Sequence, residues 1–281
     1  MDRYIDLHTH TTASDGSMSP AELVRHAGNS GLAAVAITDH DTVDGLEEAL
    51  NEADKSRMEV IPGVEIGVEY RQEMHILGYF LNGAYEGIAQ TLKILKDNRN
   101  ERNPKIVARL KEIGFNISLE DVLEEAAGGT VGRPHIANVL MKKGYVASIE
   151  EAFDRYLSQG KPAYFEKDKI SPEDGIRKII EAGGIPVLAH PIFLRHTNKE
   201  LDDLLASLKA FGLKGIEAYY TDNTDSDTGN LLRRALKHNL LVTGGSDFHG
   251  SFKPDIEIGK GFGNLRVPYG LLDRLKARAQ E

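Results

Sequence analysis

Short β-strand patterns alternate with helical patterns at both ends of the chain, and this alternation restricts the fold more than any other feature. Strand patterns cover residues 3–7, 32–37, 59–61 and 74–81, and they return at residues 185–189, 215–219 and 240–243. Helices are predicted between them, at about 20–29 and 44–56, from 171 and from 198 onward, and at 231–238. Strands that alternate with helices form a parallel sheet or a barrel, so the sequence predicts an α/β fold.

The middle of the chain, residues 82–164, lacks this alternation and has the pattern of consecutive helices. Breaks are predicted near Asn103-Pro104, Gly114, Gly128-Gly129 and Gly144, and the next strand pattern is Pro162-Ala-Tyr-Phe165. We therefore predict a discontinuous barrel made of residues 1–81 and 165–281, with residues 82–164 inserted in it as a helical cap. The length of 281 residues suits one barrel-sized domain with an insertion.

The composition excludes several kinds of chemistry. The chain has no cysteine, which excludes disulfides, thiolate-bound zinc, iron–sulfur clusters and a cysteine nucleophile. Lys and Arg number 34 against 43 Asp and Glu, and the net charge of −9 argues against extended DNA binding while leaving room for a local cationic site. The longest apolar run, residues 31–37, is too short to cross a bilayer, and the first residues lack a signal-peptide core. A cytoplasmic location without a membrane partner is expected.

Side chains that commonly bind metals recur at the ends of the predicted strands. In chain order they are His8, His10, His40, Glu65, His75, His190, Asp247 and His249. Most follow a strand directly, Glu65 is expected just past the third strand, and His75 lies within the fourth strand pattern. In barrels of parallel strands the carboxyl ends meet at one rim, where active sites are built. Residues two apart in an extended segment share a face, so His8 and His10 can approach one ion together.

The donor types are consistent with a metal centre that contains more than one ion. Imidazole suits zinc, iron and manganese, carboxylates add a preference for harder ions, and the absence of thiolate keeps all three metals possible. A bridging carboxylate such as Glu65 would bring two ions to about 3.5–4 Å, the separation used for in-line displacement at phosphorus. Scattered structural polar groups are the alternative, which does not explain why so many gather at one rim. The histidines outside the motifs, His26, His196 and His238, are predicted to be structural.

The complete set of motifs resembles that of the PHP family, the polymerase and histidinol phosphatase domain. The motifs are His8-x-His10, Asp15 in Ser-Asp-Gly, Thr38-Asp-His40, Gly63-Val-Glu65, His75, Ala189-His-Pro191 and Gly245-Ser-Asp-Phe-His249. The resemblance implies a distorted (β/α)7 barrel that carries up to three divalent metals at its C-terminal rim. It assigns one metal to His8, His10, Glu65 and Asp247, a second to Glu65, His75 and His190, and a third to Asp15, His40 and His249.

A narrower resemblance concerns Val131-Gly-Arg-Pro-His-Ile-Ala137 in the helical insertion. This segment is similar to the PHP subgroup that acts on nucleoside 3′,5′-bisphosphates and on short RNA from its 5′ end. Arg133 offers a planar fork for bidentate phosphate binding, His135 adds a donor, and Pro134 favours a helix start whose free amides attract anions. The alternative is that Arg133 and His135 only cap a helix. Arg195 is a candidate second phosphate ligand, or else a solvated loop arginine.

Four other polar residues near these motifs have structural alternatives. Arg99 and Arg102 lie on a charged helix, and an exposed position is predicted for both. Glu217 and Tyr219 end a strand at the same rim. They either support the metal ligands or serve the fold, and the sequence does not choose between these roles.

The sequence therefore predicts a metal-dependent phosphoric ester hydrolase. Its substrate would be a small phosphorylated nucleotide or a short oligoribonucleotide, with phosphate released from a nucleoside 3′,5′-bisphosphate or RNA trimmed from 5′ to 3′. The residues expected to act through a metal-activated hydroxide that attacks phosphorus in line are His8, His10, Glu65, Asp247 and His249. Arg133, with the metals, would neutralise charge on the transferring phosphoryl group.

Two other functions stay open at this point. One is a phosphatase of the histidinol phosphate type, in which the insertion closes over a small pocket, and the other is a non-catalytic metal- or nucleotide-binding module. Two or three divalent ions are expected, Mn²⁺ first, with Zn²⁺ or Fe²⁺ as alternatives. The sequence leaves open which ion is native, how many sites are filled, the physiological substrate, the general acid and the oligomeric state.

Overall fold

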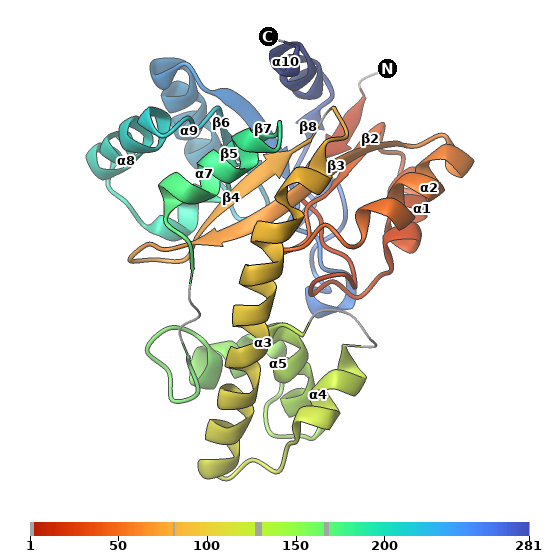
Figure 1. Ribbon diagram of the computed structural model, residues 1–281, viewed down its shortest axis with the longest axis vertical. Helices are drawn as coiled ribbons and strands as arrows, with labels where there is room; N and C mark the ends of the chain where they lie inside the picture. Colours follow the sequence, from red (N-terminus) through yellow and green to blue (C-terminus); the bar gives the residue numbers. More distant parts are fainter. Residues whose placement is uncertain (1–2, 81, 127–130, 166–168, 281) are drawn as a thin grey trace.

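The computed structural model describes residues 3–80, 82–126, 131–165 and 169–280. It confirms an α/β protein built around a barrel-shaped sheet, with a group of helices below the sheet in Figure 1. The strands lie in the order β7-β6-β5-β4-β3-β2-β1-β8. Their bounds are β1 (Tyr4–Asp6), β2 (Ala34–Ile37), β3 (Glu59–Val68), β4 (Met74–Tyr79), β5 (Ile185–Leu188), β6 (Gly215–Tyr220), β7 (Leu241–Gly245) and β8 (Val267–Pro268).

The helices of the barrel alternate with its strands as the sequence predicts. They are α1 (Pro20–Asn29), α2 (Leu46–Ser56), α7 (Pro172–Glu181), α8 (Asn198–Ala210), α9 (Asp225–His238) and α10 (Gly270–Ala279), with the short turns η1 (Tyr85–Ile88), η3 (Pro191–Leu194) and η4 (Gly250–Phe252). The predicted capping box opens α1, because the Ser19 hydroxyl accepts from the Glu22 amide and the Glu22 carboxylate accepts from the Ser19 amide. Helices α1, α2, α7, α9 and α10 pack on strands of the sheet, and α8 packs on α9.

The barrel closes where β7, at one end of the strand order, approaches β1. The Leu7 amide donates to the Gly244 carbonyl over 3.1 Å, and the Asp247 amide donates to the His8 carbonyl over 2.9 Å. A Cβ atom on Gly245 would lie only 2.4 Å from the His8 Cβ, so glycine is required for this close approach. This closure brings His8, which follows β1, beside Asp247 and His249, which follow β7.

Two strand predictions need correction, and both bear on the metal ligands. β4 runs antiparallel to β3 and to β5, so the sheet is not wholly parallel. The beginning of β4 therefore lies at the rim where β3 and β5 run towards their carboxyl ends, which explains why His75 stands near the start of its strand. β3 extends to Val68, so Glu65 lies inside the strand and not past it. The sequence pattern of a buried strand is the same whichever way the strand runs. It therefore gave no sign that β4 is antiparallel to its neighbours.

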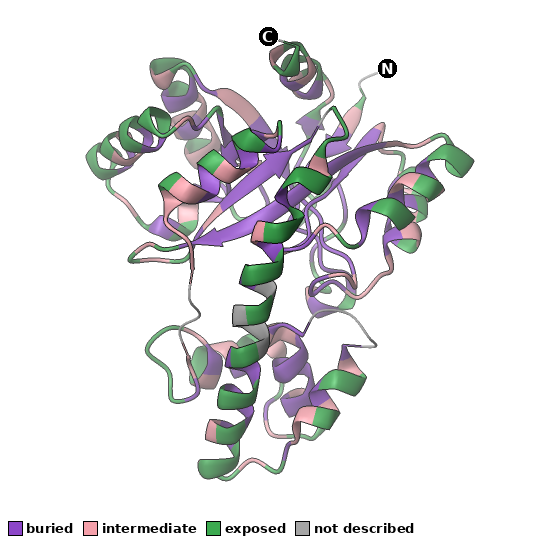
Figure 2. Ribbon diagram, viewed as in Figure 1, coloured by how far each residue is buried: buried purple, intermediate pink, exposed green. Residues whose placement is uncertain are grey.

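Helices α3 (Ala89–Glu112), α4 (Leu119–Glu125), α5 (Arg133–Lys142) and α6 (Ile149–Ala152), with the π-helical turn η2 (Phe153–Leu157), lie together below the barrel (Figure 1). They enclose a hydrophobic cluster of their own, which includes Ile106, Leu110, Ile136 and Leu140. α3 descends from the barrel to this group and presents an outward face that is largely exposed, whereas the sheet is buried (Figure 2). The later part of α3 thus packs with α4, α5, α6 and η2 as a helical unit at one end of the barrel, whereas Ile88, Leu92 and Leu95 belong to a cluster of the barrel itself.

Two predictions within this helical unit are wrong and one lies outside the described residues. α3 continues through Pro104, where a break was expected, because tertiary packing of Ile106 and Leu110 outweighs the lost backbone hydrogen bond. The pattern Pro162-Ala-Tyr-Phe165 forms turns and irregular backbone, with Ala163 buried in the helical cluster. The expected breaks at Gly114 and Gly144 are confirmed by their positive φ angles, and Gly128-Gly129 lies outside the described residues. None of the described helices is long and apolar enough to cross a membrane.

Candidate metal centre

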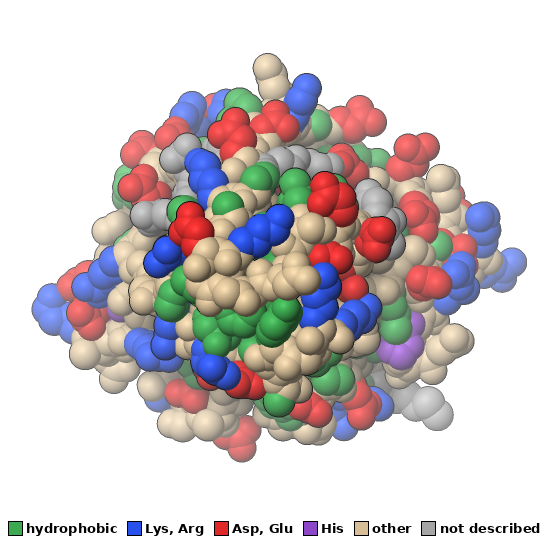
Figure 3. All heavy atoms as spheres, turned by 90° about the horizontal axis from the view of Figure 1, so that it is seen from below, with side chains coloured by type: hydrophobic (Ala, Val, Ile, Leu, Met, Phe, Trp, Pro, Cys, Tyr) green, Lys and Arg blue, Asp and Glu red, His purple; other side chains and the backbone are tan. Residues whose placement is uncertain are grey.

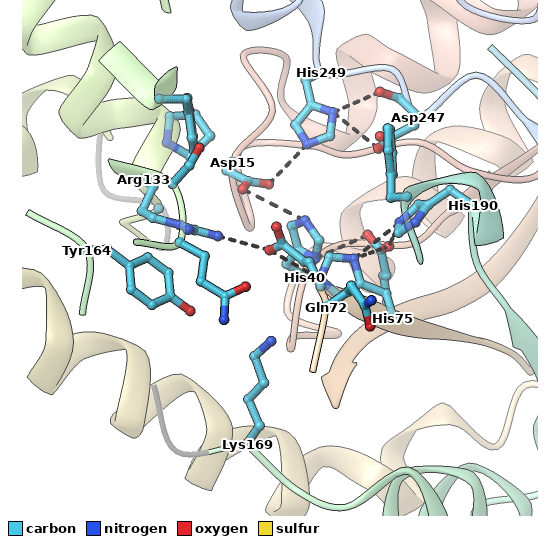
Figure 4. Close-up of a pocket in the computed structure, with 18 of the residues that line it drawn as sticks. Asp15, His40, Gln72, His75, Arg133, Tyr164, Lys169, His190, Asp247 and His249 are labelled. Carbon is cyan, nitrogen blue, oxygen red and sulfur yellow. Dashed lines mark hydrogen bonds and ion pairs between the residues drawn. The ribbon is translucent and has the colours of Figure 1, made fainter. Parts of the chain in front are cut away.

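Three overlapping groups of His, Asp and Glu side chains converge at one rim of the barrel, mostly buried. In each group the potential ligand atoms lie within 4.8 Å of one another. The first group is His8, His10, Glu65 and Asp247, the second is His40, Glu65 and His75, and the third is His10, Asp15, His40 and His249. Figure 4 shows five of these side chains, with His190, turned towards one another from different strands and loops. The strand ends thus bring together all nine residues that the motifs single out.

The first group has the spacing of ligands around a single ion. His8 Nε2 and His10 Nε2 each lie 3.2 Å from Glu65 Oε2, and they lie 3.6 and 3.1 Å from Asp247 Oδ1. Four ligands at about 2.0–2.1 Å from a tetrahedral ion are separated from one another by about 3.3 Å. The first group therefore matches the geometry of a divalent metal site with imidazole and carboxylate donors.

The other oxygen of Glu65 faces a second set of donors. Glu65 Oε1 lies 2.8 Å from both His75 Nδ1 and His190 Nε2, and these two nitrogens are 3.2 Å apart. Glu65 therefore stands between two sets of donors and has the geometry of a bridging ligand. His190 joins His75 here, in agreement with the resemblance.

The third group is centred on Asp15, and two of its members also belong to another group. Asp15 Oδ1 lies 3.4 Å from His249 Nε2, and Asp15 Oδ2 lies 4.0 Å from His40 Nε2. The other ring nitrogen of His40, Nδ1, is only 3.1 Å from Glu65 Oε2. His40 and His10 each belong to two of the three groups, whereas the resemblance gives each of them a single metal.

Buried polar atoms without partners support the metal interpretation. Among the described residues, His8 Nε2, both ring nitrogens of His10, Asp15 Oδ1 and Glu65 Oε2 are buried and make no hydrogen bond. Leaving such atoms unpaired costs about 1–3 kcal/mol each, which a metal ion would recover. Burial raises the pKa of Glu65, but His40 and other nearby histidines outweigh it and hold the pKa well below its usual range. The carboxylate is therefore ionised and can bind a cation. The residues at this rim are thus suited to hold divalent metal ions.

Hydrogen bonds orient the ligands from behind. His8 Nδ1 donates to Glu217 Oε1 over 3.0 Å, which leaves Nε2 facing the first group. The other oxygen of Glu217 accepts from the His190 amide over 2.7 Å. His249 Nδ1 donates to the Asp247 carbonyl over 2.9 Å, so its Nε2 faces Asp15. Such partners fix the tautomer and the ring orientation of metal-binding histidines.

Asp247 is held so that a single oxygen faces the first group. Its Oδ2 accepts from the Tyr220 hydroxyl over 2.9 Å and from Lys253 Nζ over 2.7 Å, while Oδ1 faces His8 and His10. The backbone of Asp247 has a φ of 57° and that of His190 a φ of 25°, conformations that non-glycine residues rarely adopt. Backbone strain of this kind is retained where the surroundings hold a functional side chain in place.

A cavity of about 390 Å³ opens in front of the metal ligands, between the barrel rim and the helical unit. Its barrel side includes Asp15, His40, Glu65, His75, His190, Asp247 and His249. Its helical side includes Arg102 from α3 and Arg133 at the start of α5, with Lys169 beyond them in the chain. A Cβ atom on Gly132 would lie 3.0 Å from the Asp15 Cβ, so the start of α5 lies against the third group. The cavity is suited to an anion that contacts metal ions on one side and cations on the other.

Comparison with known proteins gives the same interpretation as the geometry. A family model described as the PHP domain matches residues 6–249, which is most of the chain. The chain belongs to the PHP domain family. A 5′-3′ exoribonuclease of Haemophilus influenzae is 35% identical to this PHP domain over 250 residues, covering 89% of the chain and 91% of the relative. A 3′,5′-nucleoside bisphosphate phosphatase of Chromobacterium violaceum is 31% identical, covering 91% of the chain and 90% of the relative.

Among solved structures, one from Bifidobacterium adolescentis, described as a metal-dependent phosphoesterase, superposes with a TM-score of 0.87. It is 31% identical, and the match covers 98% of the PHP domain and 96% of that chain. A likeness over nearly the whole length includes the helical unit as well as the barrel. The predicted fold class, a distorted PHP barrel with a helical insertion, is therefore confirmed.

The arginines and histidine singled out in the PHP domain have different surroundings. Arg133 lines the cavity, where Nη2 donates to Glu73 Oε1 over 2.9 Å and Nη1 donates to the Leu157 carbonyl over 3.2 Å. His135 is buried, accepts from the Gly132 amide through Nδ1 over 2.9 Å, and is not among the residues that line the cavity. This contact agrees with the helix-capping alternative, and a phosphate contact by His135 stays a prediction. Arg195 is exposed at the end of η3 and also lies outside the cavity lining.

Two residues have roles that sequence reasoning did not identify. Arg102 was expected on an exposed face, but it is only 8% exposed and lines the cavity. The side chain of Arg99 lies outside the described residues. Lys253, four residues after His249, was not singled out, although a lysine so close to a metal-binding motif was an available signal. Glu217 supports the candidate ligands, which is one of the two roles that the sequence left open for it.

Replacement of Glu217 by glutamine tests whether the PHP domain depends on this support. The amide cannot accept hydrogen bonds through both ends, so either His8 Nδ1 or the His190 amide loses its acceptor. We expect metal affinity to fall about 10–100-fold, the usual cost of losing a hydrogen-bond partner of a ligand. Calorimetric titration of the metal-free protein with Mn²⁺ measures this. Unchanged affinity would show that the ligands hold their positions without Glu217.

Proposed function

We propose that this PHP domain hydrolyses terminal phosphate esters of nucleotides, either a nucleoside 3′,5′-bisphosphate or a short 5′-phosphorylated oligoribonucleotide. As a member of its family it is a metal-dependent phosphoric ester hydrolase, and the nucleotide substrate is the further step. The observation that carries this step is the position of Arg133 in the same cavity as the metal ligands. A guanidinium binds phosphate through two parallel N–H groups, so the cavity suits a substrate with a second anionic group.

Two or three divalent ions are part of the proposal, with Mn²⁺ first and Zn²⁺ or Fe²⁺ as alternatives. The residues that would hold them are His8, His10, Asp15, His40, Glu65, His75, His190, Asp247 and His249. Bound there, the ions would polarise phosphoryl oxygens and lower the pKa of water near the substrate. The carboxylates hold a net negative charge for these cations, and Glu217, Tyr220 and Lys253 keep His8 and Asp247 in place.

The cations at the cavity wall would bind and orient the substrate. Figure 4 shows Arg133 and Lys169 on the side of the cavity away from His190 and Asp247. A phosphate held by Arg133 would leave the ester at the other end of the molecule facing the metal ligands. Arg133 is half-buried beside Phe153 and Tyr164, with its Cζ 5.7 and 5.8 Å from the two ring centres, and these contacts restrict its motion. A preoriented donor loses little entropy when the phosphate arrives.

We also propose that residues 82–164 act as a cap on the barrel formed by residues 1–81 and 165–281. The support is that Arg102, Arg133 and Phe153 of this segment line the cavity, while the segment from Ile106 onward packs around its own hydrophobic cluster. Seen from below, this end of the molecule carries Lys and Arg side chains interspersed with Asp and Glu side chains (Figure 3). Mixed charge of this kind gives a weak field over a distance, and small substrates suit it better than long nucleic acid. The absence of extended DNA binding stays a prediction.

Replacement of Arg133 by alanine tests the proposed phosphate contact. We expect kcat/KM on adenosine 3′,5′-bisphosphate to fall about 10–10²-fold, because a charge-assisted, bidentate contact to the second phosphate is lost. Arg133→Lys should recover only part of this, since an ammonium cannot bind two oxygens in the same fork. Steady-state kinetics of phosphate release measures both variants. Arg195→Ala, an exposed arginine outside the cavity lining, is the matched control and should retain wild-type kinetics.

The substrate panel separates this proposal from the histidinol phosphate type of activity. The wild-type protein, loaded with Mn²⁺, is assayed side by side on adenosine 3′,5′-bisphosphate, a short 5′-phosphorylated RNA and histidinol phosphate. We expect kcat/KM to be highest on one of the two nucleotide substrates. Preference for histidinol phosphate, or an Arg133→Ala variant with wild-type kinetics on nucleotides, would overturn the proposal.

A further inference from the structure

One aromatic side chain of the cavity, Phe193, is left unusually exposed. Phe193 lies in η3, three residues after His190, and 45% of its surface is accessible although it lines the cavity. Large apolar side chains are seldom left in contact with water without a functional reason when they lie inside a binding site. The exposed ring is therefore available for a flat, apolar part of a substrate.

The other aromatic rings of the cavity lining are less available. Phe153 and Tyr164 lie against the guanidinium of Arg133, at 5.7 and 5.8 Å from its Cζ. Tyr70 is half-buried, and its hydroxyl is hydrogen-bonded to His196 Nε2 over 2.8 Å. Phe165 packs against the hydrophobic cluster of the helical unit. Of the five aromatic side chains that line the cavity within the described residues, only Phe193 is classed as exposed.

Phe193 is also held in a fixed position next to the metal ligands. Its ring makes an edge contact with Tyr220, with centres 5.6 Å apart and planes at 85°, and a tilted contact with His190 at 5.3 Å. Tyr220 in turn is tied to Asp247 by its hydroxyl. A planar group stacked on Phe193 would therefore keep a defined distance from the metal centre, without the entropy cost of ordering the ring.

We propose that Phe193 is the stacking platform for the nucleobase of the substrate, and that it gives this site its preference for nucleotides over other phosphate esters. The inference rests on the proposed nucleotide function and adds to it a residue that selects the base. With the base on Phe193, the ribose spans towards His190 and its phosphate ester faces the metal ligands. The second phosphate then faces Arg133 on the far side of the cavity. Stacking tolerates any base, because every base presents a π face.

The test compares a nucleotide with the same sugar phosphate without its base. We measure kcat and KM on adenosine 3′,5′-bisphosphate and on ribose 3,5-bisphosphate for wild type, Phe193→Ala and Phe193→Trp. For Phe193→Ala we expect KM on the nucleotide to rise about 5- to 150-fold, the range for loss of one base–aromatic stack, with kcat little changed. On ribose 3,5-bisphosphate the same variant should match wild type within about twofold. Phe193→Trp should restore the KM for the nucleotide.

Control variants separate stacking from general damage. Phe262→Ala removes another exposed phenyl ring, 57% accessible, that is not part of the cavity lining, and it should leave both substrates unaffected. Phe193→Leu keeps an apolar side chain without an aromatic face and should recover less than Phe193→Trp. An equal loss on both substrates in Phe193→Ala would mean that the ring only supports His190. An unchanged KM on the nucleotide would also overturn the proposal.

A binding measurement keeps this inference separate from the proposed activity. Adenosine 5′-monophosphate and ribose 5-phosphate are titrated calorimetrically into Mn²⁺-loaded wild type and into Phe193→Ala. The platform predicts tighter binding of the nucleotide to wild type and a loss of that advantage in the variant. If wild type turned over neither bisphosphate yet showed this pattern, the proposed hydrolysis would fail while the base platform stood. Equal binding of the two ligands to wild type would exclude the platform.

Discussion

Glu65→Gln is expected to reduce kcat on every phosphate ester by at least about a thousandfold, the largest effect of any single substitution that we predict. Both oxygens of this carboxylate are committed to the centre. Oε2 faces His8, His10 and His40 at 3.1–3.2 Å, and Oε1 faces His75 and His190 at 2.8 Å. Glutamine has the same shape but no charge, and its NH₂ group repels a cation. A metal pair that depends on one bridging carboxylate would lose its common ligand.

Metal content and a matched control make this result specific. Elemental analysis after dialysis should show that Glu65→Gln retains fewer divalent ions per chain than wild type. Far-UV circular dichroism should be unchanged, because the barrel is held by hydrophobic clusters such as the one that contains Val64 and Ile66. Glu69→Gln makes the same chemical change four residues later, at an exposed position outside the cavity lining, and should keep wild-type activity and metal content. Full activity in Glu65→Gln would remove Glu65 from the centre.

The candidate metal ligands could be singled out from the sequence because the signals that point to them are local. His8 and His10 are two residues apart at a strand end, and Asp247 and His249 repeat the same spacing. Side chains alternate between the faces of a strand, and barrel active sites lie at the carboxyl ends of the strands. These two rules were enough to predict that the candidate ligands meet at one rim. The resemblance to the PHP family added Asp15, which no strand pattern singles out.

The support for these ligands could not be predicted, because it depends on contacts between distant parts of the chain. Glu217 and His8 are 209 residues apart, and only the barrel brings them together. Arg102 lies on a helix whose charged pattern predicts exposure, but the position of α3 against the barrel buries it at the cavity. His135 shows the converse, since a buried helix cap and a phosphate donor have the same sequence pattern. Local patterns identify groups that can act, while packing decides which of them face the cavity.

Adding divalent metal is expected to stabilise the protein far more at pH 9 than at pH 6.5. In the metal-free protein, burial lowers the pKa of His10, but the carboxylates of Asp247 and Glu65, 3.1 and 3.2 Å from its Nε2, outweigh it and raise the pKa to about 9. Burial likewise lowers the pKa of His75, and Glu65 outweighs it and raises the pKa to about 9. Both histidines are therefore expected to be protonated at neutral pH. Their positive charges then offset the negative charges of the carboxylates when no metal is bound.

The direction of the pH dependence follows from these two pKa values. A histidine whose folded-state pKa is raised contributes stability that is fully present below pH 6.5 and is lost as the pH rises through about 9. The contribution is on the order of 3 kcal/mol per group, and the two are coupled through Glu65. The ionised carboxylates do not change in this range, because the pKa values of Asp15 and Asp247 are held well below their usual range. The metal-free Tm should therefore fall by about 10–20 °C between pH 6.5 and 9.

Metal ions replace these protons, and this replacement supplies the second measurement. Burial lowers the pKa of His8 as well, but Glu217, Glu65 and Asp247 outweigh it and hold the pKa well above its usual range. Because metal-bound histidines must be unprotonated, binding of Mn²⁺ at pH 7.5 should release about three protons per chain, from His8, His10 and His75. Calorimetry in buffers of different ionisation enthalpy counts the released protons, and thermal scans with and without Mn²⁺ follow the difference in Tm with pH. His26→Gln, a histidine outside the metal groups, should leave the proton count unchanged. A metal-free Tm that stays level from pH 6.5 to 9, with no proton release, would mean that the histidines are already neutral before metal binds, and it would overturn the prediction.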